Sequence, residues 1–146
     1  MKIRKQFEIK GIKFDQKPIN GYFNYKQAIE YAESVGKILI SKHEMELLLT
    51  LPRKRDSTNL YIAEKDIWLE DPDRRIELPR LGYRSPNPGN EYIMNVNIAG
   101  YYWILNNNPY SNLNRMQSYF YFNIEGIIKT YNASPLYEQS ILLKTP

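Results

Sequence analysis

The chain of 146 residues is 42% hydrophobic and 25% charged, close to the averages of globular proteins. Its length fits one domain, because single hydrophobic cores usually occupy about 100–200 residues, and we predict a single domain over residues 1–146. The formal net charge is +4, but acidic residues interrupt or follow the basic clusters, which disfavours nucleic-acid binding. The absence of cysteine excludes disulfides, zinc–thiolate sites and cysteine nucleophiles.

The amino-terminal segment begins with charged residues and lacks the apolar run of about seven or more residues of a secretory signal. Elsewhere, no stretch approaches the roughly 20 apolar residues that span a membrane as a helix. We therefore expect a protein made in a cytoplasm without a signal peptide, and no insertion into a membrane.

The first third of the chain predicts a strand followed by a helix. Residues 3–14 alternate between apolar and polar side chains, which predicts an opening strand or hairpin arm with a bulge at Gly11. The next apolar side chains recur at helical spacing, which predicts a helix over about residues 25–35. Asn24 begins a capping-box motif at its start, and Gly36 ends it.

A second short helix is predicted over about residues 42–50. Ser41 and Glu44 have the spacing of a capping box, and Ile40 is placed to pack on Met45 as a hydrophobic staple. The chain therefore carries two short capped helices in series.

The rest of the chain has no helical period. A strand is predicted around Ile67–Leu69, followed by a loop-rich region over residues 71–91 that several prolines interrupt. The last third predicts a strand at residues 100–105, a hairpin over residues 118–132 and a final strand at residues 139–144. This order predicts an α+β fold, and pairing of its first and last strands would bring the chain ends close together.

Three segments resemble the C-type lectin-like fold. "NYKQAIEYAESVGKILISKHEMELLL" (24–49) resembles its two-helix opening. "ELPRLGYR" (77–84) resembles the "LPAxGYR" segment of the Fibrobacter succinogenes major paralogous domain, a bacterial branch. "GYYWILN" (100–106) followed by "YFYFNIEG" (119–126) resembles that branch's "GYYWSST…Y.LYFN…G". The resemblance implies a C-type lectin-like domain with two short helices and a mainly antiparallel twisted sheet.

The resemblance also extends to retroelement-diversified variable proteins, which display tyrosine and asparagine for binding after the equivalent of the "YYW" segment. The chain departs from the family where "WILN" replaces "WSST" and where the ending "SVRCV" is missing. It lacks the "EPN", "QPD" and "WND" calcium ligands of the calcium-dependent lectins, so any binding is expected to be calcium-independent. The formylglycine-generating enzymes of the same fold need cysteines, which are absent.

No combination of residues indicates catalysis. His43 is the only histidine and has no evident nucleophile or metal partner, so an exposed helix position is the better interpretation. Glu70, Asp71 and Asp73 lack the spacing of a calcium loop, and a turn before a proline explains them more simply. We expect no catalytic residue, metal or cofactor, although a two-carboxylate glycosidase site stays open because separation in space is invisible in sequence.

The strand around residues 118–124 has two different faces. Its apolar face is predicted to enter the core and comprises Phe120, Phe122 and Ile124. Its other face is predicted to point outward or to a second layer and comprises Tyr119, Tyr121 and Asn123. The resemblance to the C-type lectin-like fold implies that Trp103 is buried in the core.

The polar, almost uncharged stretch Asn106–Arg115 is the predicted binding loop. Tyrosine gives contact area at low entropic cost, and asparagine gives adaptable donors and acceptors, so binding loops favour both. The candidate ligand-binding residues are Asn106, Asn107, Asn108, Tyr110, Asn112, Asn114, Arg115 and Tyr119. The same composition also fits a plain connection, because asparagine tolerates turn dihedrals. It also fits an AT-rich genome, whose codons increase the content of asparagine and tyrosine. Sequence alone does not decide between binding, a plain connection and an effect of genome composition.

The function predicted from these features is a non-catalytic binding domain. Its expected setting is a phage virion, as a fibre or decoration protein that recognises a host-surface glycan or protein. The alternative is an assembly module that packs permanently against another virion subunit or as a homo-oligomer. An enzyme ranks lowest, because no reactive pair emerges.

Overall fold

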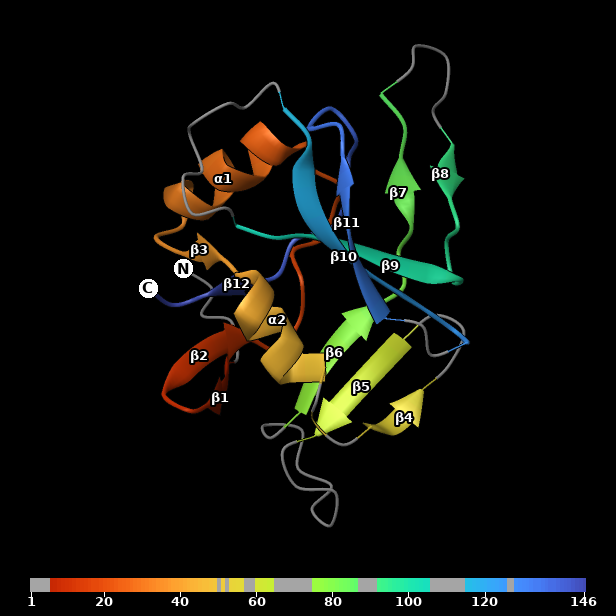
Figure 1. The fold of residues 1–146 in the computed structure, drawn as a ribbon. Helices are drawn as coiled ribbons and strands as arrows, with labels where there is room; N and C mark the ends of the chain where they lie inside the picture. The colour runs from red at the N-terminus through yellow and green to blue at the C-terminus, as the bar shows by residue number, and fades with distance from the viewer. Residues whose placement is uncertain are drawn as a thin grey trace.

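The computed structural model describes residues 6–49, 51, 53–56, 60–64, 75–86, 92–105, 115–125 and 128–146 (Figure 1). Within these ranges the strands are β1 Gln6–Ile9, β2 Ile12–Asp15, β3 Ile38–Leu39, β4 Arg53–Asp56, β5 Leu60–Glu64, β6 Arg75–Pro79, β7 Tyr83–Arg84, β8 Ile93–Met94, β9 Ala99–Trp103, β10 Gln117–Asn123, β11 Ile128–Ala133 and β12 Leu143–Lys144. The helices are α1 Tyr25–Ser34 and α2 Lys42–Leu49.

The strands of the described residues pair antiparallel in four sheets, with the orders β1-β2-β12-β3, β11-β10-β9, β4-β5-β6 and β7-β8. Two helices beside mainly antiparallel sheets confirm the predicted α+β class.

β1 and β2 form a hairpin in which Ile9 pairs with Ile12. Lys10 and Gly11 are the two turn residues, with φ angles of 51° and 79°. Positive φ at both positions is what a type I′ hairpin turn requires, and glycine adopts it without steric strain. The predicted bulge at Gly11 is therefore wrong, because Gly11 completes the turn and the pairing register continues unbroken through both strands.

The first and last described strands belong to one sheet, as predicted. β12 lies between β2 and β3, and its Lys144 pairs with Phe14 of β2. The side chain of Gln6 at the start of β1 donates a hydrogen bond to the hydroxyl of Thr145, just after β12. Figure 1 shows β1, β2 and β12 together, so the two ends of the described chain are close.

α1 has the predicted capping box. The side chain of Asn24 accepts from the backbone N–H of Gln27 at 2.8 Å, and the Gln27 side chain accepts from the backbone N–H of Asn24 at 3.0 Å. Gly36 follows the helix with φ +69°, a conformation that favours glycine at helix ends. These local signals were sufficient to place the helix to within one residue of its predicted end.

α2 also begins as predicted. The hydroxyl of Ser41 accepts from the backbone N–H of Glu44 at 3.2 Å, and the Glu44 carboxylate accepts from the backbone N–H of Ser41 at 2.8 Å. Ile40 and Met45 are both 0% exposed and lie in the same core, which agrees with the predicted staple.

The β9-β10-β11 sheet separates two hydrophobic cores. Tyr102 packs on one side with Met45 of α2, and Trp103 packs on the other with Tyr25 of α1. This division follows from strand alternation, because neighbouring residues of β9 point to opposite faces. The predicted hairpin is confirmed by the antiparallel pairing of β10 with β11. No helix in the described ranges has the length and apolar character needed to cross a membrane.

The predicted faces of β10 are correct except at its end. Phe120, Phe122 and Trp103 are buried in the cores as expected. Ile124 is 45% exposed instead of buried, because β10 ends at Asn123 and the alternation stops there. Asn123 is buried on the face of Tyr121, which agrees with the predicted second layer, because its side chain donates to the Tyr121 hydroxyl and accepts from the N–H of Glu125 after the strand.

The region over residues 71–91 contains two strands, β6 and β7, where the sequence pattern predicts a loop. Ile76 and Leu78 are both buried and lie on the same face of β6, which pairs with β5. The prolines obscured this alternation, although Pro79 is tolerated because it is the last residue of the strand. The strand predicted around Ile67–Leu69 lies outside the described residues.

Candidate functional site

The predicted binding loop falls largely outside the described residues, which include neither Asn106, Asn107 and Asn108 nor Tyr110, Asn112 and Asn114. The two candidates that are described are separated. Arg115 is exposed before β10, whereas Tyr119 is half-buried on that strand. Tyr119 lines the pocket described below, and Arg115 does not.

A continuous group of tyrosines lies against the face of the β9-β10-β11 sheet that also carries Trp103. We call it the tyrosine layer, and it consists of Tyr83, Tyr101, Tyr119, Tyr121, Tyr131 and Tyr137. Neighbouring rings in the layer have centroids between 4.8 and 6.0 Å apart. Tilted and edge-on aromatic pairs at such distances attract each other by about 0.5–1.5 kcal/mol beyond area burial.

The pairing register of the sheet assembles this layer. Tyr121 of β10 pairs with Tyr101 of β9, and Tyr119 pairs with Tyr131 of β11. Residues directly opposite in neighbouring strands place their side chains on the same face, so alternate tyrosines of three strands meet. Tyr83 of β7 joins from outside the sheet, with its ring 4.8 Å from that of Tyr101.

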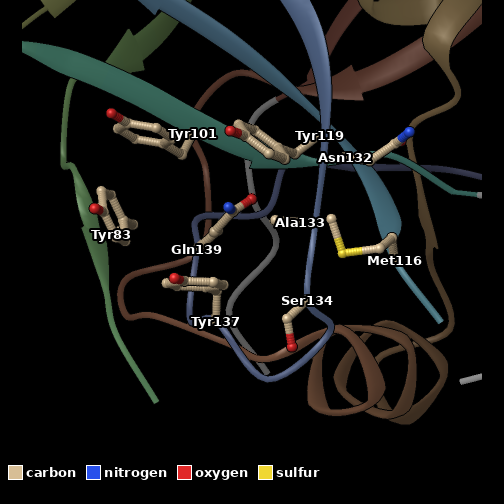
Figure 2. Close-up of a pocket in the computed structure, with 9 residues that line it drawn as sticks. All are labelled: Tyr83, Tyr101, Met116, Tyr119, Asn132, Ala133, Ser134, Tyr137 and Gln139. Atoms are coloured by element: carbon tan, nitrogen blue, oxygen red, sulfur yellow. The ribbon is translucent and has the colours of Figure 1, made fainter. Parts of the chain in front are cut away.

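A pocket of about 450 Å³ opens at one end of the tyrosine layer (Figure 2). Its lining residues are Tyr83, Tyr101, Met116, Tyr119, Asn132, Ala133, Ser134, Tyr137 and Gln139. The volume lies within the range of about 300–1,000 Å³ that is usual for small-molecule sites. None of the lining side chains carries a charge at neutral pH.

Gln139 is the unusual residue of this pocket. It is 2% exposed, and its Oε1 is buried without a hydrogen-bond partner among the described residues. Figure 2 shows its carboxamide between the ring of Tyr137 and those of Tyr101 and Tyr119. Buried polar atoms in native proteins are almost always hydrogen-bonded, so an amide left unpaired beside a pocket indicates an incomplete site.

The backbone holds Gln139 firmly in this place. Gln139 exchanges two hydrogen bonds with Phe23, each 2.9 Å long. Its neighbour Glu138 donates to β7 at 3.0 Å, and Ser140 donates to β9 at 3.0 Å. The segment is therefore joined to three other parts of the fold, which fixes the backbone position of Gln139.

The electrostatics of the pocket favour neutral hydroxyls. Burial, assisted by the neighbouring tyrosines, raises the pKa of Tyr119 to about 12. Burial also raises the pKa of Tyr101, against the opposing effect of the hydrogen bond that Asn95 donates to its hydroxyl at 2.8 Å. Both phenols therefore stay protonated at neutral pH. The nearby charges of Arg84 and Glu138 are paired with each other at 2.8 Å.

Among the described residues, no group of three or more histidine or acidic side chains could hold a metal ion. His43 is exposed on α2, as predicted, at the border of a shallow hollow that is also lined by Ser41, Lys42, Glu46 and Ser118. The acidic cluster Glu70, Asp71 and Asp73 lies outside the described residues.

Sequence reasoning missed most of this pocket. The repeated alternation Tyr101-x-Trp103 and Tyr119-x-Tyr121 could have indicated one tyrosine face, because residues two apart in a strand share a side. Gln139 gives no local signal, since its burial depends on Phe23 and on two strands distant in sequence.

No protein-family model, curated protein or solved structure matches this chain. The C-type lectin-like resemblance therefore stays a prediction from the sequence, and the function must be argued from the pocket.

Proposed function

We propose that the protein is a non-catalytic binding domain that holds a neutral group of its partner in the tyrosine-lined pocket. The observation that carries this proposal is the buried, unpartnered carboxamide oxygen of Gln139 beside an uncharged pocket of about 450 Å³. A ligand atom that bonds to this amide would complete a site that the chain itself leaves incomplete.

Energetics support a ligand over a purely structural role. An unsatisfied buried acceptor costs about 1–3 kcal/mol, so a hydrogen bond from a ligand donor would remove a penalty that the free protein carries. The backbone around Gln139 is fixed by hydrogen bonds, so the site is already organised before a ligand arrives.

The predicted loop joins two strands of the pocket in sequence. Residues 106–114 follow β9 and precede β10, and both strands contribute tyrosines to the pocket. The setting on a phage virion, and a host-surface glycan or protein as the partner, remain part of this proposal.

The proposal is tested by nuclear magnetic resonance with a panel of small neutral compounds and their charged counterparts. At least one neutral compound should saturably shift the backbone resonances around the pocket. Tyr137→Ala, which removes a lining ring, should weaken that binding, whereas Tyr131→Ala should not, because Tyr131 lies in the layer but does not line the pocket. Equal weakening by both substitutions, or no saturable shift, would contradict the proposal.

The assembly alternative is favoured by a different surface. Apolar side chains that are 40% to 76% exposed gather around β8 and the end of β10, namely Tyr92, Ile93, Met94, Val96, Ile98 and Ile124. Exposed apolar patches of this kind often mark contacts between subunits. Light scattering distinguishes the two functions: a stable oligomer at micromolar concentration favours assembly, and a monomer favours recognition.

A further inference from the structure

We infer that the pocket takes a tryptophan side chain of a partner protein, with the indole N–H donating to the carboxamide oxygen of Gln139. This inference rests on the binding function proposed above and specifies its ligand. The indole ring would pack against the lining tyrosine rings.

The lining favours a flat aromatic group. Four tyrosine rings contribute to it, and Met116, which is 61% exposed, lies at the same pocket. Methionine is flexible and polarizable and makes favourable contacts with aromatic rings. A charged ligand group would be desolvated without a counter-charge, because Arg84 and Glu138 are already paired.

Gln139 supplies an acceptor that its own surroundings leave unused. Asn132 Oδ1 already accepts from the hydroxyl of Ser118 at 2.8 Å, and the Ser134 hydroxyl accepts from the N–H of Leu136 at 3.3 Å. Gln139 Oε1 is the buried atom of the lining side chains that lacks a partner within the described ranges. An indole brings one donor and no acceptor, which matches this buried acceptor.

Gln139 can present its oxygen to such a donor. Rotation about the terminal side-chain bond exchanges Oε1 and Nε2 while the backbone stays in place, and this torsion has a broad energy profile. The oxygen, which is buried and unpartnered in the free protein, would turn toward the pocket and accept from the indole N–H.

The same molecule already accommodates an indole by this combination of contacts. Trp103 Nε1 donates to the carbonyl of Phe23 at 2.8 Å, and its ring lies edge-on to Tyr25 and Tyr119 with centroids 5.4 and 6.2 Å apart. The pocket offers the equivalent elements to a ligand: tyrosine rings, including that of Tyr119, and one acceptor.

The test is a resonance titration of the whole chain with N-acetyl-tryptophanamide and with its analogue methylated at the indole nitrogen. Methylation removes the N–H but keeps the ring. We expect the methylated compound to bind at least tenfold more weakly to the unaltered protein. In Gln139→Met, which keeps the side-chain length but has no acceptor, the two compounds should bind with equal affinity. Tyr131→Ala should preserve the tenfold difference.

Equal binding of the two compounds to the unaltered protein would overturn the inference, and this comparison needs no variant to fold. Binding of methyl glucoside in the pocket, with no binding of the tryptophan amide, would also overturn it but would leave the proposed binding function standing. If no neutral compound shifts the pocket resonances, both proposals fail.

Discussion

At the scale of single residues, we expect substitution of Gln139 to change binding without lowering the stability of the fold. Its buried oxygen has no partner among the described residues, so Gln139→Met removes an unsatisfied group and keeps the side-chain volume. We predict that the free energy of unfolding stays equal or rises by up to about 1 kcal/mol, because the lost desolvation penalty offsets any change in packing. Denaturant unfolding measures this, and a loss above about 1 kcal/mol would indicate that the amide has a structural role.

Glu44 makes stability dependent on acid pH. Desolvation raises the pKa of its carboxyl, but the hydrogen bond from Lys144 and those from Ser41 outweigh it, so the pKa lies below its ordinary value of 4.5. A lowered folded pKa gives stability that is present above pH 4.5 and lost as the pH falls through the folded pKa.

Glu44→Gln tests this dependence, because glutamine can still accept at the helix start but loses the charge facing Lys144. We predict a loss of about 1.5–3 kcal/mol at pH 7, the usual contribution of a hydrogen bond to a charged group. The difference between the two proteins should shrink as the pH falls below 4.5 and through the folded pKa of Glu44. A difference that does not change with pH would contradict this account of Glu44.

Tyr119 of the tyrosine layer makes stability fall at alkaline pH, whereas Glu44 makes it fall at acid pH. Burial, with the neighbouring tyrosines, raises the pKa of Tyr119 from 10.0 to about 12. A raised folded pKa gives stability that is complete below pH 10 and lost as the pH rises through about 12. We predict that this loss is smaller in Tyr119→Phe, which cannot ionise. Unfolding measured from pH 9 to 12 checks it, and identical profiles would contradict the assignment.

At the scale of elements, two glycines allow the cost of a strained backbone to be compared with the cost of a steric clash between neighbouring strands. Both Gly11 and Gly82 have positive φ, but a Cβ on Gly11 would meet nothing within 4 Å, whereas one on Gly82 would lie 2.0 Å from the carbonyl oxygen of Met94. Gly11→Ala should therefore cost about 1 kcal/mol from strain alone. Gly82→Ala should cost at least about twice as much, because β7 and β8 must separate. Thermal unfolding of both variants measures the difference, and equal losses would show that β8 moves freely.

Elements with local signals could be predicted from the sequence. The helices at Tyr25–Ser34 and Lys42–Leu49 begin with capping boxes, whose partners lie three residues apart. β6 was missed because its strand character depends on pairing with β5 and on burial of Ile76 and Leu78, while nearby prolines indicate a loop. The helices could therefore be predicted from local capping signals, whereas β6 could not, because its formation depends on pairing with a strand distant in sequence.

At the scale of the whole molecule, the sequence predicted the union of the chain ends but not the pocket. Strand patterns at both ends were enough to anticipate one shared sheet. The pocket needs β7, β9, β10 and the segment around Gln139 to converge, and no periodicity in the sequence specifies that convergence. Of the predicted ligand-binding residues, Tyr119 lines the pocket, whereas those within residues 106–114 lie outside the described structure.

The central claim is that the pocket beside Gln139 is where this protein meets its partner. The most direct measurement is of intermolecular nuclear Overhauser effects in a sample saturated with N-acetyl-tryptophanamide. We predict effects between the indole protons and the rings of Tyr101 and Tyr137, which line the pocket. Effects confined to the exposed apolar side chains around β8, such as Tyr92 and Ile93, would place the contact elsewhere and contradict the claim.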